Sequence, residues 1–229
     1  MNFPYKLIDL THILDNTIPT WSGECGFNHE LHLDYTDCSS EVKFRVMQMR
    51  MHAGIGTHMD APSHCIPGGR YINDFDVNEL CMPCVVIDVS DKSHERYSVA
   101  PADITAFESK YGLISKGSCV MFKTGWSQFW SNPEKYRNNH VFPSVSAEVA
   151  KLLLTRGVIA LGIDTLSPDR LEDGFKVHQT FLENGKILIE NVANLDKIPP
   201  VGSHIMAFPI KIKDGTEAPL RLVGLIARE

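Results

Sequence analysis

Three stretches of mainly apolar residues restrict the fold of this chain more than any other feature. They cover residues 84–89, 119–122 and 158–163. Runs of this length are typical of strands that are buried on both faces of a sheet. Helical patterns lie between them, from Pro101 to Gly112 and from Ser146 to Gly157, with Pro or Ser at the start and Gly at the end. Strands and helices that alternate in this way indicate an α/β architecture.

Weaker patterns add strands towards both ends of the chain. The tail reads as an antiparallel pair around Lys213-Asp214-Gly215, so the sheet is expected to be mixed. At 229 residues, the chain has a suitable length for one domain, residues 1–229, with a mixed, largely buried β-sheet flanked by helices. The added segments are strands at 6–11, 42–46 with an extension to 51, 187–189, 203–212 and 221–228, and a short helix at 178–183 that ends at Gly185.

The composition excludes several classes of function. Apolar residues make up 43% and charged residues 22%, which is typical of a globular protein. The net charge is −6 and no basic run is present, so nucleic-acid binding is not expected. No apolar run is long enough for a membrane span, and the N-terminus does not resemble a signal peptide. A soluble, cytoplasmic protein is expected.

The six cysteines do not form a recognisable framework. In a chain of this length without an export signal, most are expected to be free thiols. Cys81 and Cys84 match a Cys-x-x-Cys pattern, but no second pair exists, and Cys84 leads directly into an apolar strand. We expect ordinary buried thiols rather than a redox couple or half of a zinc site.

The segment from His52 to His64 holds the densest group of chemically active side chains. Three His and one Asp fall within 13 residues. His58 and Asp60 are two apart, so in an extended chain an imidazole and a carboxylate share one face, as zinc or manganese ligands do. Pro62 ends any regular strand, and His64 beyond it suits proton transfer beside a metal.

Other polar residues are less specific. By composition alone, His178 reads as a helix-surface residue and Glu190 as a strand-end acid. His29 and His32 suit a solvated strand face. Trp126 and Trp130 suit packing, and Asp164 a structural acceptor that holds the following loop.

The sequence resembles the cyclase family of metal-dependent hydrolases, which includes bacterial kynurenine formamidases and, more distantly, isatin hydrolases. The resemblance covers nearly the whole chain, and the spacing of His178 and Glu190 is that of the family's last two ligands. The matching segments are residues 8–11, 19–23, the specific run Gly-Thr-His-Met-Asp-Ala-Pro-Ser-His at 56–64, 124–126 and 162–169.

This resemblance implies a kynurenine formamidase-like, swivelling β/α/β fold and a site for two zinc ions or one manganese ion. Asp60 would bridge the ions or bind one of them, and His58, His178 and Glu190 would complete the coordination. His64 would be the catalytic proton shuttle, and Trp21 would stack on the ring of a small-molecule substrate. The resemblance also implies a homo-oligomer, a dimer or tetramer, and a role in tryptophan catabolism.

The chain departs from the family at one position. Gly54 stands where the family has a His, and Gly offers no ligand atom. His52 is displaced by roughly 6–7 Å along an extended strand, so it could replace that ligand only if the segment bulges.

Three functions compete on this pattern. The first is an arylformamidase-like hydrolase, which cleaves a formamide-type C–N bond of a small aromatic acid with metal-activated water. The second keeps the site but opens a lactone, ester or cyclic amide with one ion. The third is a non-catalytic metal- or ligand-binding protein in which Gly54 marks a decayed site.

Overall fold

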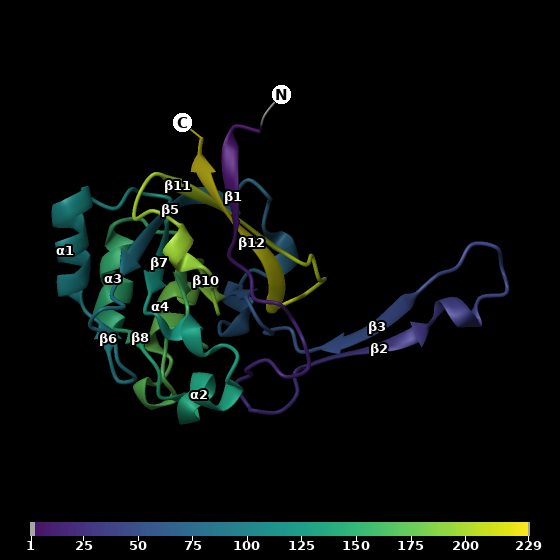
Figure 1. The fold of residues 1–229 in the computed structure, drawn as a ribbon. Helices are drawn as coiled ribbons and strands as arrows, with labels where there is room; N and C mark the ends of the chain where they lie inside the picture. Colours follow the sequence, from purple (N-terminus) through teal and green to yellow (C-terminus); the bar gives the residue numbers. More distant parts are fainter. Residues whose placement is uncertain (1–2, 229) are drawn as a thin grey trace.

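An eight-stranded mixed sheet forms the body of the protein and closes on itself (Figure 1). The computed structural model describes residues 3–228. The strand order is β1-β12-β11-β5-β7-β9-β10-β4, and a further pairing between β12 and β4 completes the barrel. The strands are β1 (Tyr5–Asp9), β4 (His58–Asp60), β5 (Cys81–Asp88), β7 (Cys119–Lys123), β9 (Ala160–Ile163), β10 (Ile187–Glu190), β11 (Ser203–Pro209) and β12 (Glu217–Ala227).

The three apolar runs are strands of this sheet, as predicted, and the structure places them in its parallel part. β5, β7, β9 and β10 are neighbours and run parallel. β11 and β12 pair antiparallel, which confirms the mixed α/β class. The sequence patterns did not predict that the sheet would close.

Helices cover the outer face of the parallel strands (Figure 1). Ser146 caps its helix as expected, because its side chain accepts a hydrogen bond from the Val149 amide. Side chains of three helices pack with the outward side of β5, β7 and β9, whereas a second apolar cluster fills the barrel interior. The helices are α1 (Pro101–Tyr111), α2 (Pro133–Arg137), α3 (Ala147–Thr155) and α4 (Lys176–Glu183), and a small parallel pair joins β6 (Ser98–Val99) to β8 (Ser144–Val145).

A long β-hairpin projects from this body (Figure 1). It consists of β2 (Phe27–Leu33) and β3 (Val46–Met51), and among residues 3–228 these two strands pair only with each other. The strand expected at 42–46 with an extension to 51 is confirmed from Val46 to Met51, but residues 42–45 lie in the hairpin loop. His29 and His32 lie exposed on β2, in agreement with a solvated strand.

Two expectations about single residues need correction. Asp164 is a buried acceptor, but it holds the loop after β7 rather than the loop that follows it, through the amides of Thr124 and Gly125. Cys81 is exposed, whereas Cys84 is buried, and all six cysteines are free thiols. Between residues 3 and 228, no helix combines the length and the apolar character that a membrane crossing requires.

Candidate metal centre

The short strand β4 places His58 and Asp60 side by side on its outer face. Met59 between them is fully buried in the barrel interior, so the alternation predicted from the sequence is present. His58 is 4% and Asp60 1% exposed. The imidazole of His58 and the carboxylate of Asp60 therefore lie on the same face of β4, and both are shielded from bulk water.

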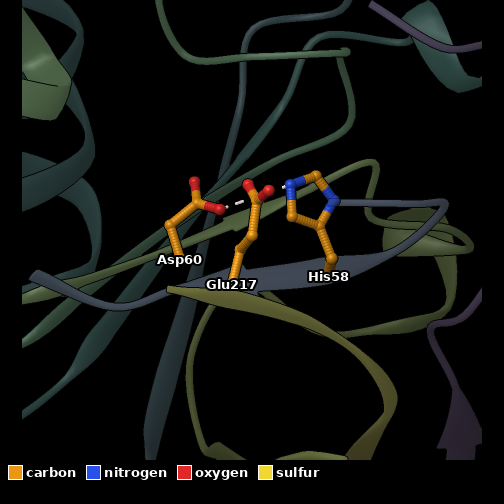
Figure 2. Close-up of side chains that lie close together, drawn as sticks. All are labelled: His58, Asp60 and Glu217. Carbon is orange, nitrogen blue, oxygen red and sulfur yellow. Dashed lines mark ion pairs between the residues drawn. The ribbon is translucent and has the colours of Figure 1, made fainter. Parts of the chain in front are cut away.

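The two strands beside β4 each add a carboxylate at matching positions. Glu190 of β10 lies opposite His58, and Glu217 of β12 lies opposite Asp60. Residues directly opposite in an antiparallel pair point to the same face. Figure 2 shows the Glu217 carboxylate between the side chains of His58 and Asp60.

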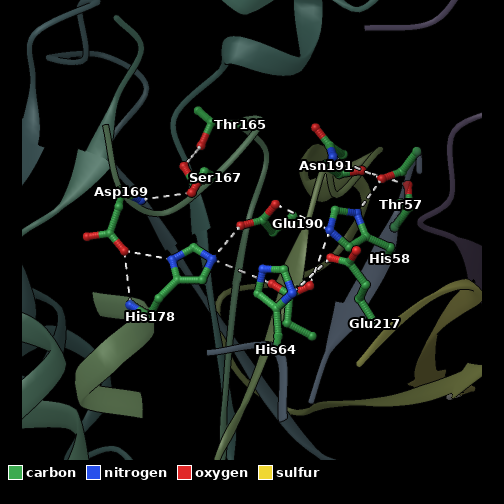
Figure 3. Close-up of polar contacts among 12 residues, drawn as sticks. Thr57, His58, His64, Thr165, Ser167, Asp169, His178, Glu190, Asn191 and Glu217 are labelled. Atoms are coloured by element: carbon green, nitrogen blue, oxygen red, sulfur yellow. Dashed lines mark hydrogen bonds and ion pairs between the residues drawn. The ribbon is translucent and has the colours of Figure 1, made fainter. Parts of the chain in front are cut away.

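The first turn of α4 contributes His178. Its ring Nδ1 lies 2.8 Å from Asp169 Oδ2, and the same carboxylate accepts the amides of Val177 and His178 (Figure 3). This contact assigns the proton to Nδ1 and leaves Nε2 free to bind a metal. His178 Nε2 is 3.7 Å from Asp60 Oδ2 and 3.4 Å from Glu190 Oε1.

A glycine turn orients His58 in the same way. Its Nδ1 lies 2.9 Å from the Gly56 carbonyl, so Nε2 faces Asp60 at 3.4 Å and Glu190 at 3.3 Å. Gly56 has φ +61°, a left-handed conformation that favours glycine, and a Cβ there would lie 2.3 Å from Leu14 Cδ2. Its carbonyl also accepts the Asn191 side-chain amide, which ties the turn to the residue after Glu190.

The carboxylates dominate the electrostatics of this cluster. Burial lowers the pKa of His58, but the charges of Asp60 and Glu190 raise it more, and the net pKa lies well above the usual value. Burial also lowers the pKa of His178, but Asp169 and Glu190 raise it more. Burial raises the pKa of Asp60, but the charge of His58 leads the opposing effects and leaves it below its usual value. The cluster therefore attracts positive charge.

The donor set fits a divalent cation. His58, Asp60 and Glu217 place one ligand atom each within 4.8 Å of one another, and so do Asp60, His178 and Glu190. Among residues 3–228, both oxygens of Asp60 and Oε1 of Glu190 are buried with no hydrogen-bond partner. Such orphaned acceptors are costly unless a ligand satisfies them. Imidazole and carboxylate are the ligands that zinc and manganese accept.

A cavity of about 470 Å³ opens beside this cluster. His64 lies at the end of the 3₁₀ turn Pro62–His64, and its ring centroid is 6.0 Å from that of His178. Its side chain is 33% exposed and its Nδ1 is 3.2 Å from Glu217 Oε2. Trp21 lines the same cavity, with Phe175 and His140 beside its ring.

The structure thus brings together all six residues that the sequence singled out: Trp21, His58, Asp60, His64, His178 and Glu190. Sequence reasoning missed Asp169, Asn191 and Glu217. Asp169 lies in a segment that had been matched to the family, but nothing local reveals that it orients His178. Glu217 precedes an apolar strand in a turn-rich tail and carries no recognisable pattern.

Comparison with known proteins identifies the family. The "Cyclase" family model, described as "Putative cyclase", matches residues 8–170. The chain belongs to the Cyclase family. This Cyclase-family chain is 30% identical to an isatin hydrolase of Roseibium aggregatum over 188 residues, which cover 76% of this chain and 72% of that protein. It is 27% identical to a kynurenine formamidase of Bacillus cereus over 217 residues, 94% and 95% of the two chains.

Solved structures agree with these relatives. The Cyclase-family chain is similar to isatin hydrolase A from Labrenzia aggregata bound to benzyl benzoate, with a TM-score of 0.86 and 26% identity. The match covers 98% of this chain and 95% of that one. The family and fold expected from the sequence are therefore confirmed.

Proposed function

We propose that this protein is a divalent-metal-dependent hydrolase that cleaves a C–N bond other than a peptide bond in a small aromatic substrate, as kynurenine formamidase does. Both named relatives are hydrolases of small molecules, which agrees with the enzyme class expected from the sequence. The proposed reaction is hydrolysis of a formamide-type bond.

The observation that carries this proposal is the pair of donor triads that share Asp60. One consists of His58, Asp60 and Glu217, the other of Asp60, His178 and Glu190. A shared carboxylate suits two ions held close together. When bound, a divalent cation lowers the pKa of water from about 16 towards about 7 and polarises a carbonyl oxygen.

His64 is the residue best placed to move a proton. It stands beside the triads rather than in either of them, and it reaches the cavity from the turn after β4. Because Glu217 faces its Nδ1, Nε2 is free to exchange a proton with the attacking water or the leaving group.

Trp21 is proposed to recognise the substrate ring. Its indole lines the cavity, and the ring of Phe175 lies 5.7 Å away, centroid to centroid. Flat apolar surfaces of this kind favour stacking of an aromatic ring. The cavity volume of about 470 Å³ lies within the range usual for small-molecule sites.

A second candidate is the opening of a cyclic amide. It is favoured by the 30% identity to an isatin hydrolase and by the similarity to a solved isatin hydrolase structure. The two reactions need the same cluster and differ in the substrate bond, so parallel hydrolysis assays separate them. Zinc is the metal proposed for either reaction, with manganese as the alternative.

A homo-oligomer in the cytoplasm completes the proposal. The hairpin of β2 and β3 supports self-association, because it exposes Leu31, Met47 and Met49, with Leu31 and Met47 directly opposite each other. A two-stranded hairpin alone is marginally stable in water, and a second copy of the chain would cover this face.

The direct test combines metal analysis with two assays. Protein purified without chelator is analysed for zinc and manganese, and then tested for hydrolysis of N-formylkynurenine and of isatin. Treatment with a chelator should abolish activity, and adding metal back should restore it. The faster substrate identifies the bond.

Asp60→Ala supplies the decisive variant, because Asp60 belongs to both triads. It should remove metal and activity together, while the exposed Asp91→Ala control should change neither. A fully active, metal-free Asp60→Ala protein contradicts the proposal.

A further inference from the structure

Glu217 faces the site from the strand that closes the barrel. It is the first residue of β12 and lies opposite Asp60 in the β12–β4 register. Its side chain is 22% exposed, and Figure 2 shows the carboxylate directed towards His58 and Asp60. One of its oxygens belongs to the group that His58, Asp60 and Glu217 form within 4.8 Å.

Glycine at position 54 leaves room for the carboxylate of Glu217. A Cβ built on Gly54 would lie 2.6 Å from Glu217 Oε2 and 2.9 Å from its carboxyl carbon. No side chain at position 54 can therefore coexist with Glu217 in this conformation. The carboxylate occupies the space that the side chain of a larger residue would take at position 54, in the segment between β3 and β4.

The opposed carboxylates at this point favour a bound cation. Like charges directly opposite on neighbouring strands are destabilising, and here Glu217 opposes Asp60. Both oxygens of Asp60 are buried and have no hydrogen-bond partner among the described residues.

We propose that Glu217 is a metal ligand that compensates for glycine at position 54, so that His58, Asp60 and Glu217 hold one ion beside the Asp60, His178 and Glu190 triad. This inference rests on the metal dependence proposed above. The first triad is then complete with three donors, rather than a decayed site with two.

His52 does not offer this third donor. His52 is exposed. Its ring lies beside Gly26, where an added Cβ would be 3.0 Å from His52 Nδ1. Within the described chain, His52 belongs to neither group of potential ligands. The segment from Gly54 to Gly56 does not turn its imidazole into the cluster.

The contact with His64 suggests a competing role. Glu217 Oε2 lies 3.2 Å from His64 Nδ1, so Glu217 could instead only orient the proton shuttle. The two roles differ in a measurable way. A ligand affects metal binding whether or not substrate is present, whereas a group that only orients His64 affects turnover.

Metal titration of the chelator-treated full chain separates these roles. Zn²⁺ uptake is measured by calorimetry for the wild type, Glu217→Gln, Glu217→Asp and the exposed control Glu134→Gln. Loss of a group that only supports a ligand lowers metal affinity by about 10–100-fold. If Glu217 is itself a ligand, Glu217→Gln should lower the affinity for one of the ions by at least about 100-fold. Glu134→Gln should match the wild type, and metal-free melting curves check that each variant folds.

The double variant Gly54→His/Glu217→Ala moves the third donor from β12 to the segment that precedes β4. It should bind Zn²⁺ more tightly than Glu217→Ala alone, because the imidazole at position 54 then occupies the space that the carboxylate has left. With Co²⁺ as the probe, its absorption spectrum should differ from that of the wild type, since nitrogen replaces oxygen in the coordination.

Three results are informative. Weakened uptake in Glu217→Gln with recovery in the double variant supports the ligand role. If Glu217→Gln keeps its metal affinity but turns over substrate more slowly, the ligand role is overturned, and Glu217 only orients His64. The proposed metal dependence stands in that case. If the wild type itself takes up no Zn²⁺ or Mn²⁺, the proposed function fails and this inference fails with it.

Discussion

The carboxylate of Asp169 binds both the backbone amide and the ring Nδ1 of His178, at 2.9 and 2.8 Å. It fixes the first turn of α4 and the tautomer of the imidazole together. Asparagine has the same shape but only one acceptor oxygen. Asp169→Asn should therefore weaken metal binding by about 10–100-fold, measured by competition with a chromophoric chelator. Asp173→Asn is the control, because Asp173 pairs with Arg170 outside the ligand groups, and equal affinities in both variants would contradict this role.

Replacement of His64 should separate proton transfer from metal binding. We expect His64→Ala to lower kcat by about 10²–10⁴-fold, the usual contribution of a positioned acid–base group, with metal content unchanged. His94→Ala, an exposed histidine elsewhere, should leave both quantities unchanged. Loss of metal from His64→Ala would show that His64 is a ligand.

Replacement of Trp21 should affect substrate binding more than turnover. An aromatic contact contributes about 0.5–1.5 kcal/mol beyond the area it buries. Trp21→Ala should therefore raise KM for an aromatic substrate by about 2–10-fold, while Trp21→Phe should retain most of the affinity. A fall in kcat at constant KM in steady-state assays would place Trp21 in the chemical step instead.

His12 should make stability depend on pH independently of the metal cluster. Burial lowers its pKa to about 4, and its ring stacks on Trp130 at 3.9 Å. Between pH 6.5 and 4 the unfolded state binds more protons than the folded state, so stability falls as pH falls and levels off below pH 4. From pH 7 to pH 5 this amounts to about 2 kcal/mol.

His12→Phe tests that dependence, because Phe keeps the stacking but cannot titrate. Urea unfolding in chelator at pH 7 and pH 5 should show the loss in the wild type and not in the variant. An equal loss in both proteins would assign the dependence to other groups.

The hairpin should control the oligomeric state. Met49 is 63% exposed on β3, opposite His29, and Gln48 points to the other face, opposite Glu30. Met49→Lys should shift the protein towards monomer in light scattering, whereas Gln48→Lys should not. A monomeric wild type, or identical masses for all three proteins, would contradict the proposed association.

The sequence predicted the parts of the site that follow from local periodicity. His58 and Asp60 share a face because β4 is extended, and Met59 between them enters the core. His178 and Glu190 have no local pattern of their own. They could be assigned only through the resemblance, because a helix, a turn and a strand separate them.

Glu217 could not be predicted, because only closure of the sheet brings it to Asp60. The expected strand began at Arg221, after the turn-rich residues 213–220. In the structure β12 already starts at Glu217, and Pro219 lies opposite His58. At 42–51 the prediction starts too early rather than too late: Val42 and Phe44 continue the alternation of β3, but among the described residues they have no partner strand and remain exposed.

Closure of the barrel between β4 and β12 also sets an order of events during synthesis. A ribosome-bound chain that has not yet released β12 can present His58 and Asp60 but not Glu217, and its sheet is still open. An ion held across that seam would bind only finished molecules, and its binding energy would favour the closed barrel over the open one.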